Sequence, residues 1–481
     1  MKLNKKIKYL FFVIITLGIT LSSCSEKGPS DEEKVLISDN ITLQVKLNIA
    51  TRAEENEDVT GGDAESLLKS VNLYFAKVDE NNPLPDNDEI IYSIVNIGGK
   101  DLSLQSGDGY NNTYLIKKQV NTDAFATIMH DKKIRLYVVA NMDCGYIEDL
   151  DQPVTFDGLK KSGSEDLFVP MSNQRATNLL DFSGMSVQDI RKFISQISDN
   201  ILDLNDLKNT MAGLSGGFGD INLERSWARI DYKDKERRTD EIPHLYTLKD
   251  TKINLKIISV SPFNVSDNYY LFRHTAKDVE NGDNIYEITL FGEEGGSPYR
   301  RIADSDWGNK TFLDTEKELF LLKEYRSDSY SPMMYVSENT STDDESGNCT
   351  GMNFHVLICN PQGEPITPDS ADIPAGISFD DMGKMTVTQS DGRVMVLEKT
   401  SATMDQTAGY YLTYPYVVEH NLVPDGETNI PMHTAIVRNN VYQLSVQSFS
   451  QLPTPEEPAN TSITVNVKVN AWRYYIISDE I

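Results

Sequence analysis

The clearest pattern in the chain is a strict alternation of apolar and polar residues over positions 41–49. Successive side chains of a strand point to opposite faces, so a period of two predicts a half-buried β-strand. An acidic, glycine-containing stretch over 54–65 follows and predicts a loop. The apolar members of the alternation are Ile41, Leu43, Val45, Leu47 and Ile49.

The same alternation returns near the C-terminus. Its polar members are Thr464, Asn466, Lys468 and Asn470, and a stiff, charged, proline-rich linker over 453–458 precedes it. A well-patterned strand on such a tether suits addition to a partner's sheet, but it equally suits an edge or core strand of its own domain. Its apolar members are Ile463, Val465, Val467, Val469 and Ala471.

Most of the chain between these two strands is also predicted to be β-structure. One amphipathic helix is expected over 187–207, where apolar residues repeat at helical spacing. The glycine-rich stretch 213–219 then predicts a boundary between a first domain, 53–219, and a second domain, 220–481. Further strands are expected over 71–75, 134–140, 253–260, 269–272, 285–291, 354–359, 409–418 and 435–446.

The first 23 residues have the features of an export signal. Four lysines precede an apolar run over 10–19, which is too short to span a bilayer, and the run leads to Leu21-Ser22-Ser23-Cys24. This ending resembles a lipobox, so we expect residues 1–23 to be removed and acyl chains to attach Cys24 to the outer membrane. An ordinary secretory peptide is the alternative.

Composition narrows the range of functions. A net charge of −28 argues against nucleic acid as a partner. Besides Cys24 there are three cysteines, which is too few for a disulfide scaffold, although pairing of Cys349 with Cys359 stays open. No metal-ligand spacing or convergent catalytic set is visible, so neither a cofactor nor an enzymatic activity is expected.

Several short segments, taken in order, resemble the fimbrillins of the Bacteroidales, the subunits of type V pili. They include the lipobox at Cys24 and the tripeptide Thr51-Arg52-Ala53. The others are LYVVAN at 136–141, ERSWARID at 224–231, NYYLFRH at 268–274, YVSENT at 335–340, IVRNNVY at 436–442 and the last strand with its closing Ala471-Trp472. The resemblance extends over most of the chain.

The resemblance implies two β-sandwich domains of transthyretin-like type with a few short helices. It also implies that an Arg-specific protease cuts between Arg52 and Ala53, releasing the propeptide 24–52 together with the first strand. The vacated groove would then accept the strand 463–471 of another copy. The expected function is that of a structural subunit of a surface fimbria that mediates adhesion. Its expected partners are other copies, related subunits and receptors on host or bacterial surfaces.

Two alternatives remain open at this stage. The first is an anchor or tip subunit, and an anchor would retain Cys24. The second is a glycan-binding surface lipoprotein, for which Tyr410, Tyr411, Tyr414 and Tyr416 would form an aromatic platform.

Overall fold

The computed structural model describes most of the chain after residue 38. The described ranges are 39–49, 65, 67–78, 88–106, 112–143, 145, 147, 150, 153–159, 168–173, 177–197, 199–207, 216–235, 241–272, 312–315, 318–322, 329–339, 348–400, 408–420, 434–454 and 459–471. Cys24, Arg52, Ala53 and the strand expected over 285–291 lie outside these ranges. Within them, no helix is long and apolar enough to cross a membrane.

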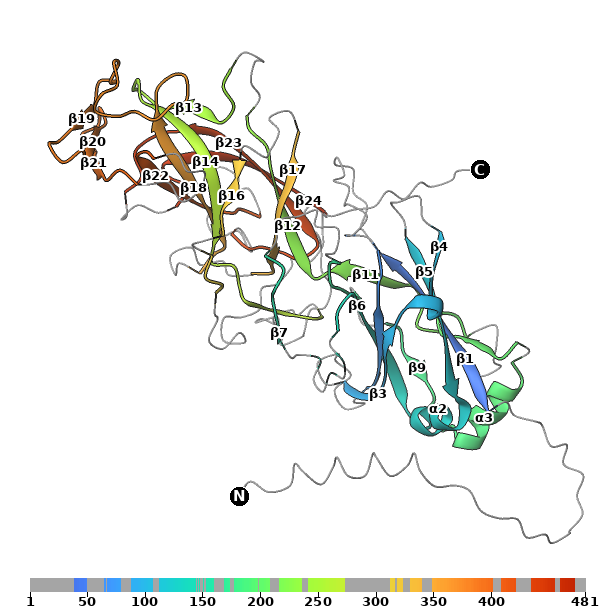
Figure 1. The fold of residues 1–481 in the computed structure, drawn as a ribbon. Helices are drawn as coiled ribbons and strands as arrows, with labels where there is room; N and C mark the ends of the chain where they lie inside the picture. The colour runs from blue at the N-terminus through green and yellow to red at the C-terminus, as the bar shows by residue number, and fades with distance from the viewer. Residues whose placement is uncertain are drawn as a thin grey trace, which may run out of the picture. The chain divides into compact units, whose positions relative to one another are not determined.

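The N-terminal lobe is one sheet of ten strands in the order β3-β2-β6-β8-β11-β1-β5-β4, with β10 paired to β1 and β9 paired to β6 (Figure 1). A short 3-10 helix, Gly99–Asp101, precedes β4. The strands are β1 (Asn40–Ile49), β2 (Val71–Lys77), β3 (Glu89–Ile97), β4 (Leu102–Ser106), β5 (Thr113–Asn121), β6 (Lys133–Ala140), β8 (Met171–Asn173), β9 (Leu180–Asp181), β10 (Ile201–Asp203) and β11 (Ile221–Arg225).

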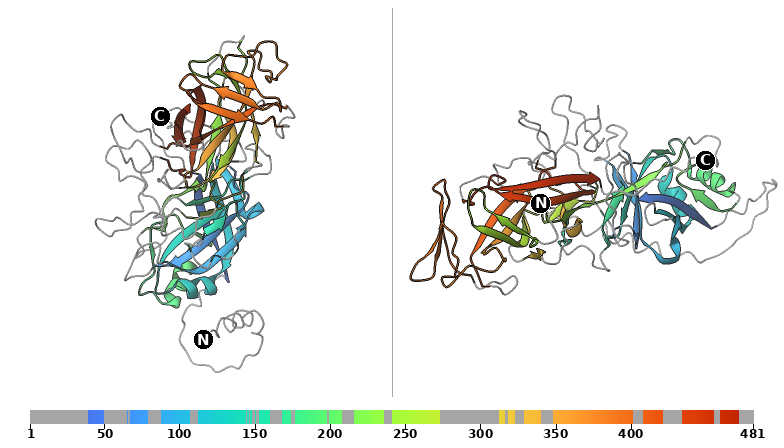
Figure 2. Two further views of the ribbon diagram at one scale, coloured as in Figure 1. Left: turned by 90° about the vertical axis from the view of Figure 1, so that its left-hand side faces the viewer. Right: turned by 90° about the horizontal axis from the view of Figure 1, so that it is seen from above.

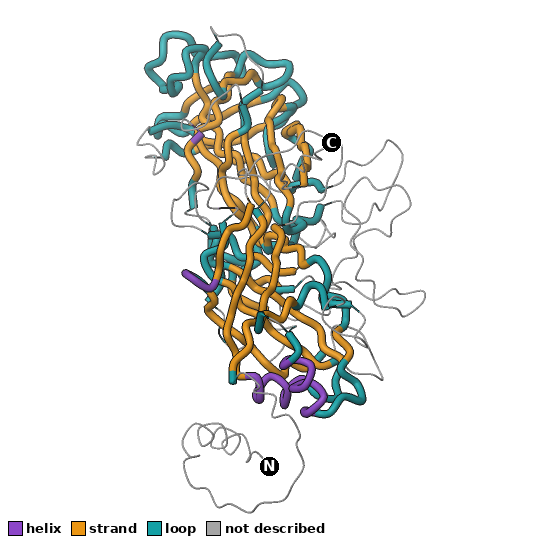
Figure 3. The backbone as a smooth tube through the Cα atoms, turned by 90° about the vertical axis from the view of Figure 1, so that its right-hand side faces the viewer, coloured by secondary structure: helices purple, strands orange, loops and turns teal. Residues whose placement is uncertain are grey.

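Two short helices lie at the end of this sheet where β1 begins (Figures 1 and 3). Helix α2 (Thr122–Met129) starts where the side chain of Asn121 accepts a hydrogen bond from the amide of Ala124. Helix α3 (Val187–Ser195) starts with a capping box between Ser186 and Asp189.

The helix expected over 187–207 is therefore only half present. It ends at Ser195, and residues 201–203 form strand β10 instead. Asn200, directly before β10, has a left-handed φ of 52°, a conformation that asparagine tolerates and that does not continue a helix. Leu202 and Leu204 still enter the core, because their spacing of two suits a strand.

The C-terminal lobe is a sandwich of two sheets around one apolar core. One sheet has the order β17-β12-β23-β24, and the other has the order β13-β14-β18-β22 with β16 paired to β14. The first comprises β12 (Trp227–Tyr232), β17 (Ser331–Ser337), β23 (Asn440–Phe449) and β24 (Ile463–Ala471). The second comprises β13 (Leu245–Thr247), β14 (Asn254–Phe263), β16 (Phe320–Leu321), β18 (Gly351–Cys359) and β22 (Tyr411–Val417).

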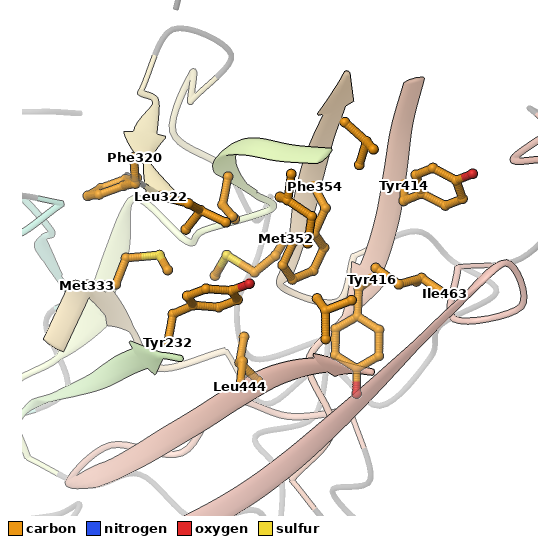
Figure 4. Packing of buried hydrophobic residues seen from close by; sticks show 14 of the residues in the cluster. Tyr232, Phe320, Leu322, Met333, Met352, Phe354, Tyr414, Tyr416, Leu444 and Ile463 are labelled. Carbon is orange, nitrogen blue, oxygen red and sulfur yellow. The ribbon is translucent and has the colours of Figure 1, made fainter. Parts of the chain in front are cut away.

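Aromatic and apolar side chains from both sheets fill the space between them. Figure 4 shows Tyr232 and Leu444 of one sheet facing Met352 and Phe354 of the other, with Ile463 beside Tyr416. The strand expected over 435–446 runs instead from Asn440 to Phe449. It starts there because Asn439 has a left-handed φ of 58°.

Two smaller β-elements complete the fold. Strand β7 (Pro153–Thr155) pairs with β15 (Asn268–Tyr270), so a segment of the N-terminal half joins the C-terminal lobe, and Phe156 and Val169 enter its core. A separate three-stranded sheet follows the order β19-β20-β21 (Figure 2). Its strands are β19 (Ile377–Phe379), β20 (Met385–Thr388) and β21 (Val394–Leu397).

Candidate functional site

The candidate site is the position of strand β1 in the N-terminal lobe, between β5 on one side and β10 and β11 on the other. We call this position the seat of β1. Every second side chain of β1 is buried, and Leu43, Val45 and Leu47 are 0 % exposed. They pack in one core with residues of β2, β5, β6, α2 and α3. Although β1 is the first described element, it is thus a central part of the sheet and not an attachment at its edge.

Both long edges of β1 carry backbone hydrogen bonds. On one side, nine residues from Asn40 to Asn48 pair antiparallel with β5. On the other side, Thr42 to Gln44 pair parallel with β10, and Leu47 to Ile49 pair parallel with β11. Removal of β1 would leave unpaired backbone groups on three strands at once.

Polar side chains bind the solvent-facing positions of β1. The amide of Gln44 donates to Asp203 over 3.0 Å, and the side chain of Asn48 contacts Asn222 over 3.4 Å. Asn205 binds the backbone of Lys46 in both directions, over 2.6 and 2.9 Å. Asn205 follows β10 and Asn222 lies within β11, the two strands that pair with β1 in parallel.

The free energy gained by burying the apolar side chains of β1 is large relative to the unfolding free energy of a domain. Burying five large side chains at about 1.5–3 kcal/mol each amounts to roughly 10 kcal/mol before entropy. The net stability of a whole domain is only about 5–15 kcal/mol. The lobe without β1 would therefore be short of stability unless another strand took its place.

Strand β24, the expected donor strand, is paired within its own lobe. Nine residues, Ile463 to Ala471, pair antiparallel with Phe449 to Asn440 of β23. Ile463 is buried, whereas Val465, Val467 and Val469 are only partly buried against the core. Among the described strands β24 ends its sheet and has one hydrogen-bonded neighbour, while β1 has three.

The two strands are similar in sequence. Aligned from Ile41 with Ile463, ITLQVKLNI and ITVNVKVNA are identical at five of nine positions. Three differences are conservative, leucine to valine twice and glutamine to asparagine, whereas isoleucine to alanine at the last position is a large-to-small change. Alternation alone does not reveal this identity, but a direct comparison of the two segments does. The identical pairs are Ile41 and Ile463, Thr42 and Thr464, Val45 and Val467, Lys46 and Lys468, and Asn48 and Asn470.

A buried ionic cluster lies where the first lobe continues into the second. The Glu65 carboxylate accepts hydrogen bonds from Arg229, over 2.8 Å, and from the Tyr335 hydroxyl. Arg225 binds the Glu65 carbonyl over 2.9 Å, and Arg229 also forms a bidentate pair with Asp231. Burial and the adjacent Glu65 raise the pKa of Tyr335, which keeps its hydroxyl a donor. Glu65 is thereby fixed to the second lobe downstream of the expected cut.

Other expected sites have a structural role or none. Cys349 and Cys359 are both free and buried, so the open possibility of a pair is wrong. Burial raises the pKa of Cys359 to about 12, which keeps the thiol protonated and unreactive. Tyr410, Tyr414 and Tyr416 are buried in the core, so the aromatic platform does not form. Within the described ranges, no group of three metal-ligating side chains occurs.

Comparison with known proteins finds similar structures but no sequence relatives. No family model and no curated protein matches the chain. Solved structures of similar fold include a candidate cell adhesion protein from Parabacteroides distasonis, with 16 % identity, coverage of 91 % of this chain and 98 % of that one, and a TM-score of 0.44.

Two structures from Porphyromonas gingivalis are also similar. A fimbrilin has 13 % identity and a TM-score of 0.38, and the match covers 90 % of this chain and 98 % of that one. The tip fimbrial protein Mfa3 has 10 % identity and a TM-score of 0.35, with coverage of 90 % and 100 %. Fimbrial proteins, which the sequence resembles, are thus among the structures that this chain is similar to.

Proposed function

We propose that this chain is a structural, non-enzymatic subunit of a cell-surface fimbria that polymerises by strand exchange. One observation carries the proposal: β24 repeats β1 at five of nine positions, and β1 occupies a seat that the N-terminal lobe needs filled. Such a chain carries both a donor strand at a sheet edge and an acceptor position in the centre of a sheet, so copies of it can assemble head to tail.

In the proposed sequence, export and lipidation at Cys24 come first. An Arg-specific protease then cuts between Arg52 and Ala53, so that residues 24–52, including β1 and the lipid, can leave. Residues 53–481 remain as the mature subunit, and its N-terminal lobe extends through β11 to Arg225. The contacts of Glu65 with Arg225 and Arg229 hold the chain after the cut in place, so that only the segment before the cut is released.

The empty seat is then filled by β24 of another copy. Ile463, Val465, Val467, Val469 and Ala471 would take the positions of the five buried residues of β1. Asn466 and Asn470 would face Asp203 and Asn222, as Gln44 and Asn48 do in the precursor. The smaller side chains of β24 fit without overpacking, which would otherwise be destabilising.

Exchange is favourable because β24 gains neighbours. In its own lobe β24 pairs only with β23, and its central valines are partly exposed. In the seat of β1 it would pair with β5 on one side and with β10 and β11 on the other, and its valines would be fully buried. Both backbone pairing and apolar burial therefore increase on transfer.

The arrangement of β1 in a central position and β24 at a sheet edge suits a stalk subunit better than an anchor, a tip subunit or a glycan-binding lipoprotein. An anchor would keep Cys24 and β1, and a tip subunit would not donate β24. The glycan-binding alternative loses support because three of its four tyrosines are buried. We assign the subunit to the cell surface, with adhesion through the assembled fibre and with copies of itself and related subunits as partners.

The test uses the full chain without its signal and lipid, beginning after Cys24. Treatment with an Arg-specific protease is expected to remove β1 and to produce a ladder of oligomers on a mild-denaturant gel. Arg52→Ala should stay monomeric, and so should a chain that ends at Ala459 and lacks β24. A cut at Arg52 that never yields oligomers, or oligomers that form without β24, would overturn the proposal.

A further inference from the structure

The three-stranded sheet β19-β20-β21 has an unusual outward face. Met395 and Leu397 of β21 pack against the core, so the alternate residues Val394 and Val396 point away from it. These two valines are 56 % and 61 % exposed. Outward positions of a surface strand are normally polar, so two adjacent exposed valines indicate a surface that is covered in some state of the protein.

The neighbours of the valines extend the same uncharged face. Val396 lies opposite Thr386 of β20, and Val394 lies opposite Thr388. Thr386 in turn lies opposite Ser378 of β19. Charged residues lie at the margins of this face: the pairs Lys384–Glu398 and Arg393–Asp391, and the exposed Asp380, Asp381 and Lys399 at the strand ends. An uncharged centre with a charged rim is the usual arrangement of a protein–protein contact.

The three-stranded sheet also contacts the start of the segment that connects β23 to β24, which we call the hinge of β24. The side chain of Gln389, in the turn between β20 and β21, binds the Ser450 carbonyl over 3.1 Å and the Leu452 amide over 2.9 Å. Arg393 donates to the Leu452 carbonyl over 3.4 Å. Leu452 marks the start of the segment that connects β23 to β24. Any subunit that takes up β24 must therefore lie close to this turn.

The length of the hinge limits the distance between Leu452 and the seat that receives β24. Ile463 lies eleven positions after Leu452. A proline-rich chain extends by about 3.1 Å per residue, so the seat begins within roughly 35 Å of Leu452. Asn460 shortens this further while its side chain stays bound to the backbone of Val417, over 2.7 and 3.1 Å.

The sequence identity of the two strands fixes the direction of entry. Read in the same direction, β1 and β24 share five of nine residues, whereas the reversed alignment matches only Val45 with Val467 and Ile49 with Ile463. Ile463 would then take the place of Ile41, where Asn40 pairs with Asn121 and helix α2 begins. The part of the incoming lobe nearest to the hinge is thus its helical end, formed by α2 and α3.

We propose that the outward face around Val394 and Val396 is a second contact between copies, and that it receives the helical end of the subunit whose seat has taken β24. This inference rests on the proposed strand exchange and adds a surface to it. The helical end offers matching apolar groups, because Ile128, Met185 and Val187 are only partly buried against its core.

Cross-linking tests this contact directly. Two populations, Val396→Cys and Val187→Cys, both in a Cys144→Ser chain, are trimmed with the Arg-specific protease, mixed and treated with a short bismaleimide. A covalent dimer of the two variants is expected after trimming and not before. Leu104→Cys, on β4 and 48 % exposed, replaces Val396→Cys as the matched control and should give no dimer.

A second variant, Val394→Lys with Val396→Lys, is expected to slow ladder formation about tenfold or more, because it brings two charges into an apolar contact. Its thermal unfolding should match that of the unmodified chain. Normal ladders without the covalent dimer, or with unchanged rates in the lysine variant, would overturn the contact and leave strand exchange standing. If the unmodified trimmed chain forms no ladder, both proposals fail.

Discussion

Asn205 and Lys46 are joined by a reciprocal pair of hydrogen bonds. The Lys46 amide donates to Asn205 Oδ1 over 2.6 Å, and Asn205 Nδ2 donates to the Lys46 carbonyl over 2.9 Å. The side chain of Asn205 thus continues the pairing of β1 between β10 and β11. Since it contacts only backbone atoms, it would hold any strand in the seat, whatever side chain stands at that position.

Asn205→Ala is expected to weaken the precursor and the assembled ladder by the same amount. It removes three hydrogen bonds, two to the Lys46 backbone and one to the Gly219 carbonyl. At about 1 kcal/mol net for each, a loss of about 3 kcal/mol is expected. Denaturant unfolding of the precursor and heat dissociation of the ladder measure the two effects. Asn222→Ala, whose contact with Asn48 is longer and exposed, is the control and should cost less. A loss confined to the precursor would show that the seat is not reused.

The destabilising effects of Leu43→Ala and Val467→Ala should change in opposite directions on assembly. Leu43 is fully buried, so its truncation should destabilise the precursor by about 2–5 kcal/mol. Once β1 has left, the effect should vanish from the ladder. Val467 is partly buried in the precursor, where Val467→Ala should cost about 1 kcal/mol, and should cost about 2 kcal/mol in the ladder. Urea titration of both states tests the crossover, and equal effects in both states would contradict it.

Glu65→Ala is expected to destabilise the chain by about 3–5 kcal/mol, because it leaves the buried guanidinium of Arg229 with one carboxylate fewer. Glu65→Gln keeps a carbonyl acceptor for Arg229 and should cost less. Lys384→Ala is the control, because its pair with Glu398 is exposed and should contribute little. Guanidinium-induced unfolding gives the comparison, and an effect of Glu65→Ala no larger than that of Lys384→Ala would show that the cluster is not stabilising.

His355 should make the C-terminal lobe sensitive to acid. Burial lowers the pKa of His355 to about 4, and its ring contacts the hydroxyls of Ser261 and Thr413. The unfolded chain takes up the proton near pH 6.5, so this contribution is complete above pH 6.5 and is lost as pH falls toward 4. It amounts to at most about 3 kcal/mol. The loss of unfolding free energy between pH 7 and pH 4.5 should be smaller for His355→Gln than for the unmodified chain. Equal losses in the two chains would contradict this role of His355.

The sequence predicts the local elements of the site well and their partners poorly. The alternation over 41–49 and 463–471 gives β1 and β24 almost to the residue, because a period of two is a local property. The pairing of β1 with β10 and β11 joins residues more than 150 positions apart, and no local pattern encodes it.

Two errors have the same physical origin. Tyr414 and Tyr416 share one face of β22, and Tyr410 directly before the strand is buried with them. Their even spacing predicts a common face, but periodicity does not say whether that face is the inner one. Apolar residues after Ser195 fit a helical repeat and a short strand equally well, so periodicity does not predict that β10 follows the left-handed Asn200.

In the folded precursor both copies of the repeated strand are already in use, one in the seat and one along β23. Under the proposed assembly, crowding alone would not start a fibre, because no vacant position exists to receive a neighbour. Breaking one peptide bond would set the time of growth, and because the displaced segment departs as a separate molecule, the step would not readily reverse.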